Sequence, residues 1–328
     1  MTELQRYLAE EVAEDHADGI ITRREAMRRL GLLGVTGAGA TSLLAAFSSG
    51  ARASDGHKGS EGRGRSSRRA RDRDWAPVAT EAITFPGPRG TLMAAWAAAE
   101  KARGGVLVIH ENRGLNDHIR SVAGRFAASG YSALAIDLLS EEGGTGAFPG
   151  EAEVGAALGA IAPERFVEDM KAGLSELKRR VSRKRVAATG FCFGGGMVWL
   201  LLTSGVRRLA AAAPFYGPFP EGGELGSSKT AVLGIYAGLD DRVNATRDAA
   251  HAAVDAARLK HQFVTFTEAD HAFFNDTGPR FNPAAMAEAY RLVLGWFDRF
   301  VADDDDDEDG DDGKHGEGRM SDKHGRRG

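Results

Sequence analysis

The stretch that most constrains the fold of this chain is a short strand that turns sharply into a helix around the only cysteine. It runs from Val186 to Leu202, with the sequence Val-Ala-Ala-Thr-Gly-Phe-Cys-Phe-Gly-Gly-Gly-Met-Val-Trp-Leu-Leu-Leu. Gly190 and Gly194 stand two residues before and after Cys192, where side chains would collide as the strand folds back onto the helix. The pattern predicts a sulfur atom in a strained turn at a helix N-terminus, where the helix dipole and the backbone N–H groups favour the thiolate.

Other interpretations of this stretch are a buried structural cysteine beside a glycine-rich packing contact and a phosphate-binding loop. The loop is disfavoured because no Lys-Ser or Lys-Thr pair follows the glycines. With one cysteine the chain forms no internal disulfide, and it has no second thiol to resolve a redox intermediate. A nucleophilic role for Cys192 is therefore the favoured hypothesis.

Length and charge limit the classes of protein to which this chain could belong. The chain has 328 residues, 42% of them hydrophobic, which is enough for a substantial core. Its net charge is −4, but residues 303–328 hold eleven acids and five bases, a balance of −6 that leaves +2 for the rest. A nearly neutral body argues against a nucleic-acid partner.

The first residues resemble an export signal. Thr22–Arg28 contains the pair Arg23-Arg24 of a twin-arginine signal, and it precedes the apolar stretch Leu30–Phe47. Ala51-Arg-Ala53 has the small-residue pattern of a cleavage site, which predicts a mature chain that begins at Ser54. We expect residues 1–53 to direct the protein, through the twin-arginine export machinery, to the periplasm or beyond; the alternatives are an amphipathic N-terminal helix and an uncleaved anchor.

Composition divides the remainder into three parts. Residues 54–74 carry seven basic and four acidic side chains among serines and glycines, which predicts a disordered basic linker. Residues 75–301 contain the apolar patterns of a folded domain. Residues 302–328 begin with a block of nine acids within ten residues and are expected to form a disordered acidic tail. The chain has no uninterrupted apolar run of eighteen residues, so we expect that the mature form does not span a membrane.

Apolar runs alternate with helical patterns through residues 75–301. Two strands, 82–85 and 92–96, flank a Pro-Gly-Pro-Arg-Gly turn and should pair antiparallel. The other strands are expected at 106–109, 133–136, 209–215, 232–236 and 263–266, besides the strand before Cys192, and helices at 117–129, 163–180, 245–260 and 283–300, with a glycine-rich excursion at 140–162. This alternation predicts an α/β fold with a mostly parallel, doubly wound sheet flanked by helices.

Candidate partners for the cysteine follow two late strands. Asp240 and Asp241 come shortly after the strand that ends near Tyr236, and His271 follows the strand that ends near Phe266. The carboxyl ends of parallel strands meet at one edge of the sheet, so these side chains should lie near Cys192. The order cysteine, acid, histidine is that of the α/β-hydrolase fold. We choose Asp240 as the acid because it comes first after the turn, although the sequence leaves Asp241 open; a structural role for His271 is the alternative.

The loop after strand 106–109 should complete the site. Backbone N–H groups of Phe193 and Asn112 are the expected oxyanion hole. Glu111 lies at the mouth of the site, where its carboxylate could hydrogen-bond the sulfur and control its ionisation, unless it is solvated or paired with Arg113.

Five motifs together resemble the dienelactone hydrolase family. They are His110–Arg120, Gly190–Gly195, Phe215–Gly217, Gly238–Val243 and Asp270–Asp276, and the resemblance covers about residues 78 to 300. It implies a Cys192, Asp240, His271 triad, a glutamate at position 111 that draws the proton from the thiol, and hydrolysis of an unsaturated lactone without a metal or organic cofactor.

Four side chains in these motifs are expected to bind the substrate, namely Arg113, Tyr216, Phe273 and Asn275. One departure concerns Asn275, which stands where the dienelactone-cleaving members hold the substrate carboxylate with an arginine. Asparagine does not replace a bidentate arginine, so Arg113 or Arg280 would have to substitute. We therefore expect an exported hydrolase of a small lactone or ester, and the alternative is a catalytically weak binding or scaffold protein on the same fold.

Overall fold

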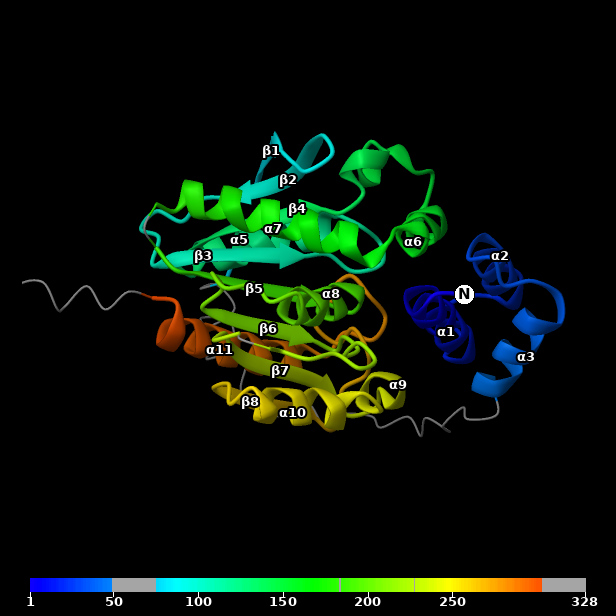
Figure 1. Ribbon diagram of the computed structural model, residues 1–328. Coiled ribbons are helices and arrows are strands. Elements are labelled where there is room, and N and C mark those ends of the chain that lie inside the picture. Colours follow the sequence, from blue (N-terminus) through cyan, green and yellow to red (C-terminus); the bar gives the residue numbers. More distant parts are fainter. Residues whose placement is uncertain (49–74, 183, 227, 303–328) are drawn as a thin grey trace, which may run out of the picture.

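The structure is a computed structural model that describes residues 1–48, 75–182, 184–226 and 228–302. The expected basic linker, the cleavage site at 51–53 and nearly all of the expected acidic tail lie outside these residues. The described part of the chain forms one mixed sheet with helices on both faces (Figure 1). A group of three helices lies beyond the carboxyl ends of the parallel strands.

The sheet has eight strands in the order β1-β2-β4-β3-β5-β6-β7-β8. Their bounds are β1 Glu81–Pro86, β2 Thr91–Ala97, β3 Gly104–Ile109, β4 Tyr131–Asp137, β5 Val186–Phe191, β6 Ala211–Phe215, β7 Ala231–Ala237 and β8 His261–Phe266. The pairs β1–β2 and β2–β4 are antiparallel, and all later pairs are parallel. The expected turn-linked pair and the mostly parallel sheet are both confirmed.

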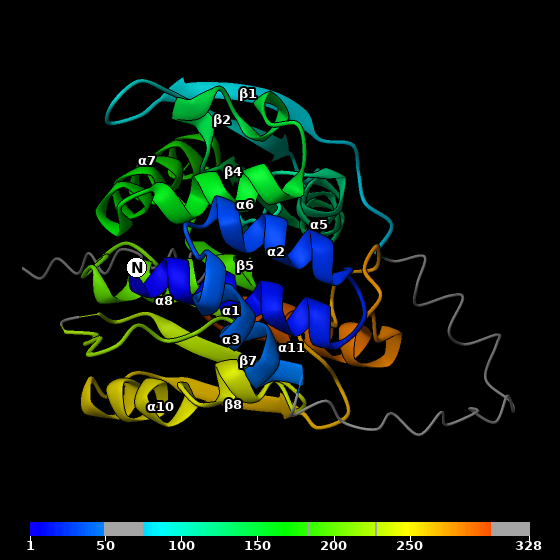
Figure 2. The same cartoon turned by 90° about the vertical axis from the view of Figure 1, so that its right-hand side faces the viewer.

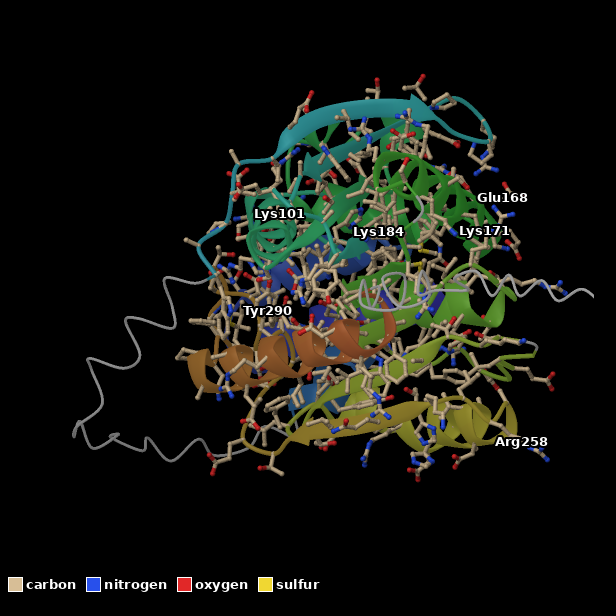
Figure 3. The ribbon with its side chains drawn as sticks, turned by 90° about the vertical axis from the view of Figure 1, so that its left-hand side faces the viewer. Lys101, Glu168, Lys171, Lys184, Arg258 and Tyr290 are labelled. Atoms are coloured by element: carbon tan, nitrogen blue, oxygen red, sulfur yellow. The ribbon has the colours of Figure 1, made fainter. Side chains whose placement is uncertain are left out.

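Helices cover both faces of this sheet, as the view along the strands in Figure 2 shows. One face carries α7 (Pro163–Arg180), α8 (Phe193–Thr203) and α10 (Arg247–Ala256), and the other carries α5 (Asp117–Ala128) and α11 (Pro283–Phe300). Every residue of β3, β4 and β5 is buried, as expected for central strands covered on both sides. Figure 3 shows the opposite side of the molecule, where Tyr290 marks α11.

Local signals explain where these helices begin. The Asn116 side chain accepts a hydrogen bond from the backbone N–H of Ile119 and caps α5, and Asn282 caps α11 in the same way. α7 and α11 each begin with a proline, whose missing N–H costs nothing in the first helical turn.

Two segments of the domain differ from the sequence-based expectation. The excursion at 140–162 contains two short 3-10 helices, η1 (Ser140–Glu142) and η2 (Thr145–Ala147), and an α-helix, α6 (Glu151–Ala160). The expected helix at 245–260 is shorter and follows a single turn, α9 (Asp241–Asn244). α6 was missed because its glycines and alanines give almost no hydrophobic periodicity.

The N-terminal residues form three helices that pack on the domain. They are α1 (Glu3–Ala17), α2 (Arg23–Leu32) and α3 (Gly37–Ser48). Figure 2 shows them in blue across the edge where the parallel strands end. Leu8 and Leu30 are buried, so apolar side chains of this segment form part of the hydrophobic core. Among the described residues, no helix is long and apolar enough to cross a bilayer.

Candidate active site

Cys192 lies at the turn between β5 and α8 in a strained backbone conformation. Its φ of 56° falls in the left-handed region, which costs free energy for a residue with a side chain. A Cβ on Gly190 would lie 2.2 Å from the carbonyl oxygen of Gly194, and a Cβ on Gly194 would lie 2.4 Å from that of Ile109. Only glycine fits at either position, so the steric reason inferred from the sequence holds.

His271 and Asp240 meet beside this turn. The His271 Nδ1 atom lies 2.6 Å from Oδ2 of Asp240, and both side chains are buried. A second Asp240 oxygen accepts a hydrogen bond from the backbone N–H of Val243, which fixes the carboxylate. A ring nitrogen of His271 lies within 4.8 Å of the Cys192 sulfur. The Nε2 atom, on the side of the ring away from Asp240, has no hydrogen-bond partner among the described residues. Asp241, the other candidate acid, begins α9 and is exposed.

The loop after β3 is held by His110. The backbone N–H of Leu138 donates to His110 Nε2, so the proton is on Nδ1, which donates to the carbonyl of Glu111 at 2.7 Å. Burial lowers the pKa of His110, in agreement with a neutral ring. This ring therefore positions Glu111 and Asn112 at the edge of the site.

Glu111 does not hydrogen-bond the sulfur in this structure. Its Oε2 atom accepts a bond of 2.6 Å from the Asn275 side chain, and its Oε1 atom has no partner among the described residues. Asn275 also accepts hydrogen bonds from Thr277. This residue, expected at the substrate, lines the cavity beside Cys192 and holds the Glu111 carboxylate.

The other expected site residues divide into two groups. Asn112 and Arg113 line the cavity beside Cys192, and Phe193 is the first residue of α8, so its N–H has no partner within the helix. Tyr216 and Phe273 are fully buried behind the histidine: the Tyr216 ring lies 5.2 Å from the His271 ring and 5.3 Å from that of Phe273. They support His271 rather than line the cavity.

Helix α1 supplies two side chains to the sulfur that the sequence did not predict. The Cys192 thiol donates to the Glu11 carboxylate, with distances of 3.2 Å to Oε1 and 3.4 Å to Oε2. The Tyr7 hydroxyl lies 3.4 Å from the same sulfur. Glu11 Oε1 is also 3.9 Å from His271 Nε2. The carboxylate bound to the thiol therefore comes from residue 11.

Two arginines beside the site form ion pairs with other acidic residues of α1 and with the residue that follows its C-terminus. Arg242 lies 3.2 Å from Glu14, and its guanidinium stacks 4.4 Å from the centre of the Tyr7 ring. Arg280 lies 2.8 Å from Asp15 and also pairs with Asp18. Arg113 pairs instead with Glu151 of α6, at 3.5 Å.

This environment keeps the thiol protonated. Burial, and next the negative charge of Glu11, raise the pKa of Cys192 to about 11, although His271 opposes the shift. Burial alone would lower the pKa of His271, but the Asp240 carboxylate and the sulfur raise it well above its usual range. The expected thiolate is therefore disfavoured while α1 covers the site.

Little space remains beside the sulfur. The cavity has a volume of about 30 Å³ and is lined from the domain by residues that include Glu111, Cys192 and His271, and from the N-terminal segment by Glu11, Asp15 and Ile20. Glu11, Cys192 and His271 each offer a potential metal-binding atom within 4.8 Å of the others. Such a metal would bind through the same sulfur and imidazole that a nucleophilic mechanism requires.

Comparison with known sequences identifies the family. The sequence model of the Dienelactone hydrolase family matches residues 92–301, which include Cys192, Asp240 and His271. The chain belongs to the dienelactone hydrolase family. Two curated relatives of this dienelactone hydrolase family member are named "Putative carboxymethylenebutenolidase". The one from Escherichia coli O157:H7 is 29% identical over 232 residues, which are 65% of this chain and 84% of the relative. The one from Salmonella typhi is 30% identical over 238 residues, 66% of this chain and 87% of the relative.

A solved structure has the same fold as this dienelactone hydrolase family member. The crystal structure titled "Putative Dienelactone Hydrolase" from Klebsiella pneumoniae aligns with a TM-score of 0.60 and 24% identity, and covers 67% of this chain and 98% of that one. The α/β-hydrolase fold expected from the sequence is confirmed. Membership of the family makes the protein a dienelactone hydrolase-like hydrolase. Helices α1 to α3 precede the matched residues.

The contribution of α1 had a signal in the sequence. The first eighteen residues contain six acids and one arginine, an unusual charge for a segment that precedes an export signal. Acidic residues at 11, 14, 15 and 18 recur at helical spacing and point to one face that meets basic side chains.

Proposed function

We propose that this protein hydrolyses a carboxylic ester or lactone through Cys192, His271, Asp240 and a thioester acyl-enzyme. The observation that supports this proposal best is the strained turn that carries a lone thiol within 4.8 Å of a histidine, which an aspartate orients at 2.6 Å. A nucleophile, a base and a group that orients the base are the parts that acyl transfer needs.

In the first half of the proposed reaction, the neutral form of His271 accepts the thiol proton through Nε2, and the Asp240 carboxylate stabilises the imidazolium that forms. The sulfur attacks the carbonyl carbon, and the carbonyl oxygen becomes an oxyanion beside the N–H groups of Phe193 and Asn112. The C–O bond to the leaving oxygen breaks, and His271 returns its proton to that oxygen. A lactone substrate remains attached because its alcohol and acyl groups are one molecule.

In the second half of the proposed reaction, a water molecule takes the position that the leaving oxygen occupied. His271 takes a proton from water as the water oxygen attacks the thioester, and the sulfur leaves as thiolate and takes that proton back from His271. Asp240 stays ionised and holds Nδ1–H towards itself, so Nε2 faces the reacting atoms in both halves.

The test of the nucleophile compares Cys192→Ala and Cys192→Ser with the parent on aryl esters and on a dienelactone. We expect hydrolysis to fall to background for Cys192→Ala and by at least about 10²-fold for Cys192→Ser, since the site favours a sulfur nucleophile. Trapping of an acyl group on Cys192, measured by mass spectrometry, would establish the thioester. Equal hydrolysis by the parent and both variants would refute the assignment and leave the weak binding protein as the better hypothesis.

We also propose that the protein is exported by the twin-arginine route. Arg23 and Arg24 support this proposal, because both are exposed at the start of α2 while the segment is docked. Fractionation of cells that express the parent and Arg23→Lys/Arg24→Lys tests it. We expect the parent outside the cytoplasm and the variant inside; equal distribution would reject export by this route.

A further inference from the structure

Residues 1–48 form an addition to the family domain that covers its active site. They precede the residues that match the family, 92–301, and Figure 2 shows α1 in front of the ends of β5 and β7. That edge of the sheet carries Cys192 and His271, so α1 lies where a substrate would have to enter.

Contacts outside the sulfur fix the segment in this position. Leu8 and Leu33 pack against α6 so closely that a Cβ on Gly159 would lie 3.2 and 3.1 Å from their methyl carbons. Arg28 pairs with Glu153 of α6. The segment therefore rests on apolar packing as well as on the ion pairs of Glu14, Asp15 and Asp18.

The space that remains is too small for a substrate. The 30 Å³ cavity beside Cys192 has room for one or two water molecules, whereas an ester or lactone adds a ring or chain around its reacting carbonyl group. Cys192 is itself only 2% exposed. Attack on a substrate therefore requires α1 to move.

The group that α1 places at the sulfur has the chemistry of a reaction product. Hydrolysis of an ester or lactone releases a carboxylate beside the nucleophile, and the Glu11 carboxylate accepts the hydrogen bond of the thiol at 3.2 Å. Arg242 and Arg280 are meanwhile paired with Glu14 and Asp15, so the same helix neutralises two of the basic groups beside the cleft.

We propose that residues 1–48 are an internal inhibitor, in which α1 fills the substrate cleft and the Glu11 carboxylate occupies the place of the product acid. Turnover requires this segment to leave the cleft, whether it undocks or is removed by the cleavage expected before Ser54. Its departure also exposes the thiol and removes the negative charge that opposes its ionisation. The inference rests on the proposed function, since it assumes that Cys192 is the reacting group.

The test uses the full chain and the single cysteine. In Glu14→Gln/Asp15→Asn the pairs of Glu14 with Arg242 and of Asp15 with Arg280 are removed, and the pair of Asp18 with Arg280 remains. No atom that contacts the sulfur changes. Alkylation of Cys192 by iodoacetamide should be at least about tenfold faster than in the parent, and hydrolysis of an aryl ester should rise by a similar factor. The matched control is Glu10→Gln/Glu224→Gln, which makes the same charge change with one substitution on α1 and should alter neither rate more than about twofold.

A second variant distinguishes undocking of α1 from a local folding defect caused by the charge changes. Leu8→Ala leaves every charge in place but removes packing against α6, and it should also accelerate alkylation while the melting temperature of the domain changes little. If both variants alkylate at the parent rate, residues 1–48 do not inhibit and the inference is wrong. If alkylation accelerates but no ester is hydrolysed, the segment covers the thiol as inferred, and the proposed hydrolysis fails instead.

Discussion

At the residue scale, the two neighbouring aspartates give a matched pair of variants. Asp240 is buried against His271, whereas Asp241 is exposed at the start of α9. We expect Asp240→Asn to lower kcat/KM for an aryl ester by about 10²–10⁴-fold, because the amide no longer holds the imidazole in the required tautomer. Asp241→Asn should stay within about twofold of the parent. A larger loss in Asp241→Asn than in Asp240→Asn would reverse the assignment.

The ionisation of the thiol gives a second prediction at this scale. Burial and Glu11 raise the pKa of Cys192 to about 11, so only the rare thiolate reacts near neutral pH. The alkylation rate of the parent chain should therefore rise about tenfold per pH unit from pH 7 to pH 10, without a plateau. Rates measured with iodoacetamide check this, and a plateau that begins near pH 7 would show instead that the resting sulfur is a thiolate.

At the scale of single elements, the turn between β5 and α8 depends on its glycines. Gly194→Ala would put a Cβ 2.4 Å from the carbonyl oxygen of Ile109 and 2.5 Å from that of His110, so we expect a loss of about 3 kcal/mol or more in the free energy of unfolding. Gly295→Ala is the control, because Gly295 is exposed in α11 and its added Cβ meets nothing within 4 Å. This control should gain up to about 1 kcal/mol. Urea denaturation measures both, and equal stability of the two variants would contradict the packing argument.

The strands and the cysteine turn were predictable from the sequence because each depends on local pattern. The apolar run at 106–109 and the glycines at 190 and 194 limit the chain to few conformations, and the structure has a central strand and a sharp turn there. The placement of Asp240 and His271 followed from the rule that parallel strands end at one edge. α6 was missed because its alanines and glycines have no distinct apolar face.

The position of Glu11 depends on contacts between residues far apart in the chain. It reaches Cys192 across 181 positions, and no local pattern specifies which acid of the N-terminal segment docks on the sulfur. Glu111 was a reasonable expectation at the sulfur because it directly follows the strand and His110. Asn275 binds it instead, from a loop after β8 whose course the sequence does not specify.

At the scale of the whole molecule, the docking of residues 1–48 combines ion pairs with apolar packing. Salt screens the pairs of Arg242 and Arg280 with α1, although partial burial limits the effect. We expect ester hydrolysis by the parent to rise severalfold between about 0.02 and 0.5 M NaCl as the segment undocks. Glu14→Gln/Asp15→Asn should lose most of this dependence. Assays at constant pH in both salt concentrations test this prediction. The same salt response in parent and variant would show that the ion pairs of Glu14 and Asp15 do not hold the segment in place.

The cover over Cys192 also bears on how the protein withstands oxidants. Peroxide and other small oxidants react with a cysteine when it is an exposed thiolate. Cys192 is only 2% exposed, and its thiol donates a hydrogen bond to Glu11. Damage would therefore be confined to the molecules in which α1 has lifted, and a stored sample would keep its reactive sulfur until the moment of use.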